Sequence, residues 1–567
     1  MEIPSGIPNL PSLLFARAAM WPDQPMLRHF AKGAWHAVTW AEFARQTAAC
    51  ARFFQSVPIP PGSRVLMVSD NRPELLMAEV ALMAIGAVPV PTYTTNAVAD
   101  HAHIMRDAGA VIVIAGNRVL ADRLRAASAQ AAPLSHLFVL DDPLPGEIPL
   151  APAFTDAGPP DTIIAAAALI PAANLACLIY TSGTSGPARG VMLPHRSILS
   201  NIAGVAEVVR RLNLKDEVYL SFLPSSHSFE HTVGQFLLPA MQVEIAYATG
   251  IEHLADNMQT VRPTIMAVVP RILEVIRARI LAQVGRGGKA KQLLFRAAIE
   301  AGGRAAAKRQ RVSDRLLLPL LDRLVLKQVR ARFGGRLRIL VSGGARLPPE
   351  VGLFYQAIGF TLLQGYGQTE AGPVISVNQP PSIRPETVGA PLLGVELRIA
   401  DDGEILVRGD LVMQGYWNRP EATAATLRDG WLHTGDIGVI ETDGHLRITD
   451  RKKDLIILSG GENVSPAHVE SILMAEPEIL QAVVAGEGKA NLSALIVPAQ
   501  DAGETQIREA VKRANARLGS FERVRRHYLV EAFTIENGLL TPTQKIRRAI
   551  IIEHYKDRLT LDPGIEK

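Results

Sequence analysis

Short apolar runs that end in glycine-rich loops recur along this chain, and segments with helical spacing follow them. Residues 176–180, ACLIY, precede a glycine loop at 181–190, after which apolar residues recur every three or four positions. The order returns where LRILV at 337–341 leads into SGGA, a helix opening at a pair of prolines, and a strand at 361–366. Because such units build parallel sheets covered by helices, we predict an α/β fold.

The character of the sequence changes toward the carboxyl terminus. Asp443-Gly444 lies between two strand-like runs, which predicts a β-hairpin. Ser465 followed by Pro466 is typical of a helix start. We therefore expect a large amino-terminal domain of sheets layered with helices and a β-rich subdomain, and then a small α+β domain. The predicted division is residues 1–449, a linker at 450–453 and residues 454–567.

The composition excludes several protein classes. With 567 residues, 48% of them hydrophobic and 20% charged, the chain can bury a large core, so it is neither disordered nor fibrous. Cys50 and Cys177 are too few for a disulfide framework or a four-thiolate zinc site, which indicates a reducing compartment. The amino terminus lacks the pattern of a secretory signal, so we expect a cytoplasmic protein.

An uncharged stretch at residues 162–188 is long enough to be a candidate membrane span. Pro171 and Asn174 interrupt its apolar part, and its second half is a polar glycine loop that could not satisfy its backbone groups in lipid. We interpret the stretch as a buried strand that leads into a loop.

Positive charge is concentrated in residues 281–338, which contain 15 Lys and Arg residues against three acidic residues, although the whole chain carries only +4. Leucines at helical spacing lie between these cations. A solvated basic helix face is the simpler interpretation, and a peripheral contact with the anionic inner face of a membrane is the alternative. Nucleic acid is not expected, because the segment has little aromatic interleaving and no nucleic-acid-binding motif.

Three polar motifs could carry chemistry. The loop Thr181–Gly190 combines four hydroxyls and three glycines, so its N–H groups can approach a polyanion, although a flexible turn has the same composition. Gly365–Glu370, GYGQTE, offers a ring for a base, a hydroxyl for a phosphate and a carboxylate for Mg²⁺, or is an ordinary strand end. Gly430–Asp436, GWLHTGD, ends in a carboxylate that could accept two ribose hydroxyls or sit in a turn.

Seven motifs in order resemble those of the adenylate-forming enzymes, and within that superfamily the fatty acyl-CoA synthetases. YTSGTSGPARGVMLPH resembles the phosphate loop, LPSSHSFE the acyl-site motif and YGQTE the nucleotide motif of that family. GWLHTGD, DRKKD, SGGENVSP and NGLLTPTQKIRR complete the series. The resemblance extends from about residue 10 to about residue 555.

The resemblance implies a ligase that uses ATP, Mg²⁺ and CoA. The carboxylate of a medium- or long-chain fatty acid attacks the α-phosphorus of ATP to give acyl-AMP and pyrophosphate, and the CoA thiol then displaces AMP. It further implies an amino-terminal AMP-binding domain and a mobile carboxyl-terminal lid that turns about DRKKD.

The roles of the family's residues are carried over to matching positions of this sequence. The resemblance implies that the phosphates and Mg²⁺ are held by Thr181, Ser182, Gly183, Thr184, Ser185, Gly186, Arg189, Thr369 and Glu370. Of these, Thr184 and Glu370 would lie at Mg²⁺. The residues implied to hold adenosine are Gly343, Gly344, Ala345, Gln364, Tyr366, Gly367, Asp436 and Arg451. Lys545, Glu370, Arg189 and His227 are the implied catalytic residues, Lys453 the hinge, and Gly460, Gly461 and Glu462 the turn that approaches the thiol.

One position departs from the family pattern. The phosphate loop usually reads Pro-Lys-Gly where this chain has Ala188-Arg189-Gly190, and its proline stands earlier, at Pro187. Arginine keeps the charge but presents a planar fork of donors rather than a point charge. We expect pyrophosphate binding to survive this change.

Other functions remain open from the sequence. Within the family, the acyl-AMP could pass to the thiol of an acyl carrier protein, and a non-catalytic acyl-nucleotide binder is a further alternative that the retained Lys545 and Glu370 disfavour. From a different class, His227, Glu230 and His231 match the H-x-x-E-H signature of a zinc peptidase, although a third ligand is not identified. A near match to a dinucleotide fingerprint at 285–290 lacks a preceding strand.

Overall fold

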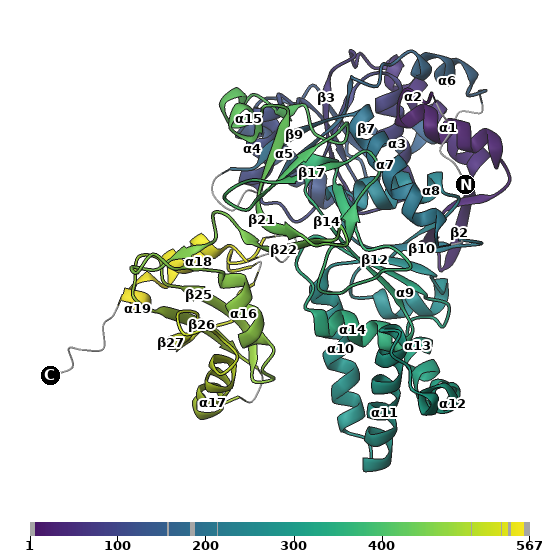
Figure 1. Ribbon diagram of the computed structural model, residues 1–567. Coiled ribbons are helices and arrows are strands. Elements are labelled where there is room, and N and C mark those ends of the chain that lie inside the picture. The colour runs from purple at the N-terminus through teal and green to yellow at the C-terminus, as the bar shows by residue number, and fades with distance from the viewer. Residues whose placement is uncertain are drawn as a thin grey trace.

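The computed structural model describes residues 6–155, 158–181, 187–212, 214–499, 502–534, 536–541 and 546–560. Figure 1 shows a large body that contains the first three quarters of the chain and a smaller body that carries the carboxyl-terminal helices and strands. Sheets and helices alternate in the large body, and the small body places helices against one sheet. The predicted fold class, a large α/β part followed by a small α+β part, is confirmed.

A nine-stranded sheet carries most of the residues considered below. Its central strands run parallel and are buried on both faces, which explains why they are continuous apolar runs in the sequence. In spatial order the strands are β16 (Ala390–Pro391), β15 (Val374–Val377), β14 (Thr361–Gly367), β13 (Ile339–Ser342), β12 (Ile265–Val268), β10 (Val218–Ser221), β11 (Glu244–Tyr247), β1 (Pro25–Ala31) and β2 (Ala34–Thr39).

Two further sheets complete the α/β part of the large body. A parallel sheet has the order β4 (Val88–Pro91), β3 (Arg64–Val68), β5 (Ile112–Ala115), β6 (His136–Val139) and β7 (Ile148–Pro149). A small antiparallel sheet has the order β19 (Gly415–Tyr416), β9 (Arg189–Pro194) and β8 (Leu175–Thr181).

Most helices and short helical segments of the large body cover these sheets, and part of the second group below projects away from them. The first group, in chain order, is α1 (Leu10–Met20), α2 (Trp40–Ser56), α3 (Pro73–Ala84), α4 (Val98–Ala108), α5 (Arg118–Ala129), α6 (Asp161–Ala168), α7 (His195–Arg210), the π-helical η2 (Glu230–Leu237), α8 (Leu238–Ala240) and α9 (Leu254–Val261). The second group is α10 (Pro270–Gly285), α11 (Lys289–Ala306), α12 (Val312–Leu321), the π-helical η3 (Asp322–Leu326), α13 (Lys327–Ala331) and α14 (Pro349–Ile358).

A β-rich part connects the two bodies. Its strands are β17 (Glu396–Ile399), β18 (Glu404–Arg408), β21 (Trp431–Ile440), β20 (Leu427–Arg428) and β22 (Leu446–Arg451), and α15 (Pro420–Thr426) precedes β20. Strands β21 and β22 form the hairpin predicted around Asp443-Gly444. The hairpin begins earlier than expected, because residues 431–436 of the motif GWLHTGD belong to β21, so interpreting Asp436 as a turn residue is wrong.

The small body has its own buried clusters, formed by residues between Ile456 and Leu559. The Ser465 side chain accepts a hydrogen bond from the His468 N–H, which confirms the helix start predicted there. Its strands are β23 (Ile456–Ile457), β24 (Asn463–Val464), β25 (Ile479–Ala485), β26 (Leu492–Pro498) and β27 (Val524–Leu529), and its helices are α16 (Pro466–Met474), α17 (Glu504–Asn515), α18 (Arg548–His554) and α19 (Lys556–Thr560).

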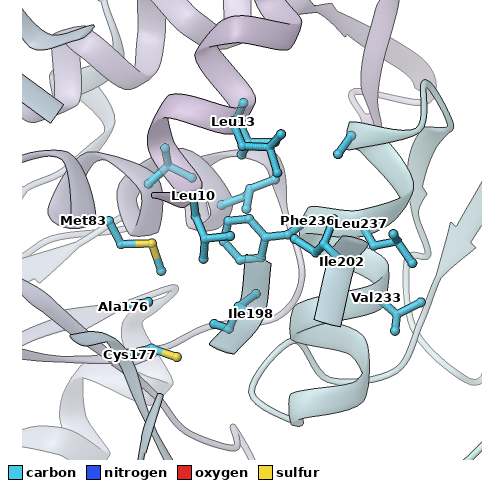
Figure 2. Close-up of a cluster of buried hydrophobic side chains, with 14 of the residues drawn as sticks. Leu10, Leu13, Met83, Ala176, Cys177, Ile198, Ile202, Val233, Phe236 and Leu237 are labelled. Carbon is cyan, nitrogen blue, oxygen red and sulfur yellow. The ribbon is translucent and has the colours of Figure 1, made fainter. Parts of the chain in front are cut away.

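The main core of the large body joins segments that are far apart in the sequence. Figure 2 shows Phe236 of η2 among Leu10 and Leu13 of α1 and Ile202 of α7, all four fully buried. Cys177 of β8 lies at the edge of the same cluster. Both cysteines of the chain, Cys50 and Cys177, are buried free thiols. Because η2 and α7 are fixed by this core, the side chains on their other faces are held in place.

The candidate span at residues 162–188 is divided between α6 and β8. The buried strand that the sequence predicted is β8, whereas the first part of the stretch is a helix and residues 182–186 lie outside the described residues. Across the described residues, every helix is too short or too polar to cross a membrane. The glycine loop expected at 181–190 is shorter than predicted, since β9 already begins at Arg189 and pairs Gly190 with Tyr180.

A pair of adjacent glycines tests how closely α11 packs on α14. A Cβ added at Gly302 would lie 2.1 Å from the carbonyl oxygen of Ala357, whereas at Gly303 the nearest atom is 4.0 Å away. Gly303→Ala should stabilise the helix by about 1 kcal/mol through propensity alone. Gly302→Ala should instead lower stability by about 1–3 kcal/mol, because the helices must separate. Thermal unfolding midpoints measure both, and equal shifts for the two variants would contradict the packing.

Candidate active site

A large cavity of about 2400 Å³ lies between the ends of the central strands, the β21–β22 hairpin and the small body. Its lining changes character along its length. The part next to β14 and the hairpin is polar and rich in arginine, and the part next to α7, η2 and α10 is lined mainly by aliphatic side chains. One cavity can therefore accept a molecule, or two joined molecules, with a charged end and an apolar end.

Asp436 is the best-defined acceptor at the polar end. Its Oδ2 accepts a hydrogen bond of 2.6 Å from the Tyr366 hydroxyl, and its Oδ1 lies 3.3 Å from Nε of Arg451. Asp436 and Arg451 face each other across the β21–β22 pairing, and Tyr366 comes from β14. Burial and the neighbouring Asp436 carboxylate raise the pKa of Tyr366 well above its ordinary value, so the hydroxyl remains a donor.

Glu370 and Arg189 both contact Tyr416. Glu370 Oε1 accepts a hydrogen bond of 2.8 Å from the Tyr416 hydroxyl, and the Arg189 guanidinium lies over the Tyr416 ring, 5.5 Å from its centroid. Tyr416 belongs to β19, which pairs with β9, the strand that begins at Arg189. All three residues line the cavity, so a carboxylate and a guanidinium face the same space.

The junction of the polar and apolar parts is formed by Thr369, Ser228 and His227. The hydroxyls of Ser228 and Thr369 share a hydrogen bond of 2.9 Å, and both residues are buried. The Phe229 N–H donates to Nδ1 of His227 at 3.2 Å. The hydroxyl of Thr369, from the predicted nucleotide motif, thus lies beside Ser228 of the predicted acyl-site motif.

Gly367 lies where the chain turns at the end of β14. A Cβ added there would lie 1.8 Å from the carbonyl oxygen of Pro373, so a larger residue would push the two backbone segments apart. The Gln368 N–H donates to the same Pro373 oxygen at 3.0 Å. The glycine is thus required for the tight turn that presents Thr369 and Glu370.

Several buried polar atoms at the cavity have no hydrogen-bond partner among the described residues. They are Ser342 Oγ, Gln364 Oε1, Gln368 Nε2 and Asp450 Oδ2. Such atoms cost free energy unless a ligand or water satisfies them, so they mark the wall that a polar molecule contacts. Burial also raises the pKa of Asp450. Of the four, only Gln364 was among the predicted site residues. Ser342, Gln368 and Asp450 lie in the predicted segments SGGA, GYGQTE and DRKKD, but no role was assigned to them from the sequence.

Other predicted residues at the polar end also line the cavity. Gly343, Gly344 and Ala345 form the turn after β13, and Gly344 has a φ of +82°, a conformation that favours glycine. Thr181, at the end of β8, lies at the same cavity. Lys453 lies at its rim, beyond the end of β22.

None of the predicted site residues of the small body that the structure describes lines this cavity. The turn Gly460, Gly461 and Glu462 between β23 and β24 is exposed and does not line it. Thr541 and Ile546 do line it. Lys545 lies outside the described residues, as do Ser182, Gly183, Thr184, Ser185 and Gly186 of the glycine loop.

The H-x-x-E-H string does not form a zinc site. His231 Nε2 is 2.8 Å from Glu79 Oε1 in the core, and Glu230 accepts hydrogen bonds from Ser221, Tyr219 and Gln235. Burial raises the pKa of Glu230 to about 7. The described residues contain no group of three or more His, Cys, Asp or Glu side chains placed to hold a metal ion. The zinc-peptidase alternative is therefore wrong, because Glu230 and His231 bond to other residues of the core while His227 faces the cavity.

The apolar part of the cavity runs between α7 and η2. It is lined by Val205, Val208, Val209 and Leu212 from α7 and the segment after it, by Phe229, Val233 and Leu237 from η2 and its start, and by Ile265, Ala267 and Leu363 from the sheet. Further along, Ile272, Val275, Ala278 and Leu281 of α10 continue this lining. Sequence reasoning missed these residues, because they come from five elements, α7, η2, β12, β14 and α10, whose spacing along the chain carries no common pattern.

Comparison with solved structures gives the same architecture over nearly the whole chain. An anthranilate CoA ligase, AuaEII, in complex with anthranoyl-AMP superimposes with a TM-score of 0.76 at 19% identity, covering 98% of each chain. ATP-bound MatB from Rhodopseudomonas palustris gives 0.73 at 23% identity, covering 96% of this chain and 99% of that one. At these identities the likeness shows the fold.

The sequence comparisons are more specific. The long-chain-fatty-acid–CoA ligase FadD15 of Mycobacterium tuberculosis is 32% identical over 579 residues, which cover 96% of both proteins. The model of the AMP-binding enzymes matches residues 14–417, and that of the AMP-binding enzyme C-terminal domain matches residues 453–560. On these matches, and with the predicted motifs gathered around one cavity, the chain belongs to the family of AMP-binding enzymes.

Proposed function

We propose that this protein is an ATP-dependent ligase that converts a medium- or long-chain fatty acid to its CoA thioester. The observation that carries the proposal is a single cavity with an arginine-rich polar end and a long aliphatic arm. A nucleotide fits the first and an alkyl chain the second. The name of the mycobacterial relative, a long-chain-fatty-acid–CoA ligase, supports the same substrates.

Adenosine would occupy the polar end. Asp436 can accept hydrogen bonds from both ribose hydroxyls while Arg451 and Tyr366 hold its carboxylate in place. Gln364 Oε1, buried and without a partner among the described residues, can accept from the exocyclic amine of adenine. The ring of Tyr366 and the turn Gly343–Ala345 supply the surfaces that would flank the base.

The phosphates would lie between Arg189, Thr181 and Glu370. Arg189 can bind phosphate oxygens through two parallel N–H donors, which is why arginine can replace the family's usual lysine here. Mg²⁺ typically takes one or two carboxylates together with substrate phosphates, and Glu370 with Thr184 fits that requirement. When bound, Mg²⁺ would neutralise charge on the phosphate oxygens.

The first chemical step brings two anions together. A carboxylate oxygen attacks the α-phosphorus, the bond from that phosphorus to the bridging oxygen breaks, and pyrophosphate leaves with the electron pair. Donors aimed at the developing charge lower this barrier, and we assign that role to Thr369, His227 and Lys545. Ile546, the neighbour of Lys545 in the sequence, lines the cavity, which supports the assignment.

The second step places the CoA thiol at the acyl carbonyl, where it displaces AMP. We propose that the small domain, residues 454–567, turns about the linker at 450–453 between the two steps. The location of Gly460–Glu462 outside the cavity, while Ile546 lines it, supports a change of orientation before the thiol can bind near that turn. An acyl carrier protein would present the same kind of thiol, so the acceptor is decided by experiment.

The acyl substrate is tested by ATP–pyrophosphate exchange across fatty, aryl and short-chain acids. Because the aliphatic arm extends from Val205 to Leu281, we expect exchange to increase with alkyl chain length up to the medium- or long-chain range. Thioester formation with free CoA, compared with a panel of carrier proteins, then identifies the acceptor. Exchange driven by aryl acids alone would contradict the fatty-acid assignment.

Glu370→Gln tests the Mg²⁺ and phosphate assignment. The change removes one negative charge while keeping the size of the side chain, so adenylation should fall steeply and the Mg²⁺ concentration for half-maximal rate should rise at least tenfold. Tyr416→Phe is the matched control, since it removes the 2.8 Å hydrogen bond to Glu370 but keeps the carboxylate, and should have a smaller effect. An unchanged Mg²⁺ requirement in Glu370→Gln would exclude this role.

Lys545→Ala and Lys453→Pro separate the two half-reactions. Loss of one preorganised donor costs roughly 10²–10³ in rate, so Lys545→Ala should slow adenylation to that extent yet still convert supplied acyl-AMP and CoA to thioester. Lys453→Pro fixes φ in the linker and should retain adenylation but slow thioester formation. Among the described residues, the Lys453 N–H donates no backbone hydrogen bond that proline would remove.

Each half-reaction is followed directly, by acyl-AMP formation and by thioester release, on protein whose unfolding midpoint matches that of the parent. Equal damage to both half-reactions in folded Lys545→Ala would contradict the alternation of the small domain.

A further inference from the structure

The helices α10 to α13 extend away from the sheets as a projecting group, visible at the lower edge of Figure 1. They contain most of residues 281–338, where the sequence concentrates its positive charge. None of the site residues discussed above belongs to α11, α12, η3 or α13.

The inner face of α12 packs against α11. Leu321 is buried against Ala298 and Ala301 of α11, and Leu318 packs on the same cluster. Arg304 of α11 forms a bidentate ion pair with the buried Asp314 of α12. Its Nε and one terminal guanidinium nitrogen lie 2.8 and 2.7 Å from the two carboxylate oxygens. Helix α12 is therefore held in a defined orientation by its inner face.

The outer side of α12 and η3 exposes an aliphatic stripe. The exposed fractions are 78% for Val312, 77% for Leu316, 53% for Leu317, 55% for Leu320 and 48% for Leu324. Val312, Leu316, Leu320 and Leu324 recur every fourth residue, so they follow one line along the helix surface. Single exposed leucines are ordinary, but a continuous row of them on a surface helix marks an interaction site.

Cations that lack an ion-pair partner accompany this stripe. Within the described part of the chain, Arg315 and Arg323 on either side of Leu320, and Lys327 just beyond Leu324, form no ion pair, and all three are exposed. By contrast, Arg304 and Arg330 on the inner side are paired with Asp314 and Asp322. Both acidic residues of α12 and η3, Asp314 and Asp322, are thus paired with arginines, and the three cations without an ion pair make the outer face positive.

We propose that the outer face of α12 and η3 docks on an anionic lipid membrane. Aliphatic side chains in a row with cations beside them allow the leucines to enter the boundary between headgroups and acyl chains while the cations meet lipid phosphates. This goes beyond the ligase function and does not depend on it. It favours the second of the two interpretations of residues 281–338, because the face carries five exposed aliphatic side chains as well as cations.

Charge distinguishes lipid from the other occupants. In a symmetric contact between two copies of this chain, Arg315, Arg323 and Lys327 would face the same cations of the partner, which is repulsive. Nucleic acid would satisfy the cations but leave the leucines against a polar backbone. An anionic bilayer satisfies both kinds of side chain at once.

The experiment measures partition of the full-length protein onto vesicles of phosphatidylglycerol and phosphatidylcholine, without ATP or fatty acid. Binding should require the anionic lipid. It should fall when salt is raised from 0.1 to 0.5 M, because the Debye length, about 10 Å at 0.1 M, becomes shorter and screens the cations from the lipid phosphates. Leu316→Ser should lower the partition coefficient roughly tenfold, because one buried leucine is lost. Arg315→Gln should lower it about fivefold, the effect of one cation near the surface.

Matched controls come from other surfaces of the chain. Leu169, 83% exposed in the segment after α6, gives the control Leu169→Ser, and the exposed Arg45 of α2 gives Arg45→Gln. Both should bind vesicles like the parent protein. Exchange activity with a dispersed medium-chain acid, and the unfolding midpoint, should be unchanged in all four variants, so that a failed ligase assignment and a failed docking assignment remain distinguishable.

Three results would overturn the proposal. The first is the absence of binding to anionic vesicles at 0.1 M salt. The second is equal binding by Leu316→Ser and the parent protein. The third is a dimer that light scattering detects at high protein concentration and that Leu316→Ser abolishes, together with an absence of vesicle binding. That result would assign the stripe to contact with a second copy of the chain.

Discussion

The buried carboxylate of Asp436 joins the parts of the protein that build the nucleotide end of the cavity. It is held by Tyr366 from the nine-stranded sheet and by Arg451 from the adjoining strand of the β21–β22 hairpin. A buried carboxylate is costly without such partners, so the three residues fix β14 and the hairpin relative to each other. Because β22 leads directly into Lys452 and Lys453, the same contact positions the start of the linker to the small body.

The division of the cavity into a polar and an apolar part follows from which elements reach it. The polar part is made by strand ends and the turns after them, where backbone N–H groups and short polar side chains are available. The apolar part is made by the inner faces of α7 and η2, which the core around Phe236 holds in place. Ser228 and Thr369, joined at 2.9 Å, lie where the two parts meet, which is where a carboxylate would be joined to a phosphate.

The family's motifs account for the polar part but not for the projecting helices. Near the cavity, charged residues are paired or face the site, as Asp436 and Glu370 do. On α12 the acidic residue Asp314 is buried in an ion pair, whereas Leu316, Leu317 and Leu320 are exposed. The other face of the helix packs on α11 through Leu318 and Leu321.

The sequence by itself determined the α/β class, the order of the motifs, the hairpin at Asp443-Gly444 and the helix start at Ser465, because each depends on local periodicity, turn chemistry or capping. It also indicated the family, because the seven motifs can be recognised one after another along the chain, in the order in which the family has them. Only the tertiary structure decided that Glu230 and His231 belong to the core rather than to a metal, and that Asp436 lies in a strand. It alone assembled the acyl arm from α7, η2, α10 and the sheet, and showed which leucines of residues 281–338 face outward. These properties depend on which segments pack together, and contacts between distant segments leave no periodic trace in the sequence.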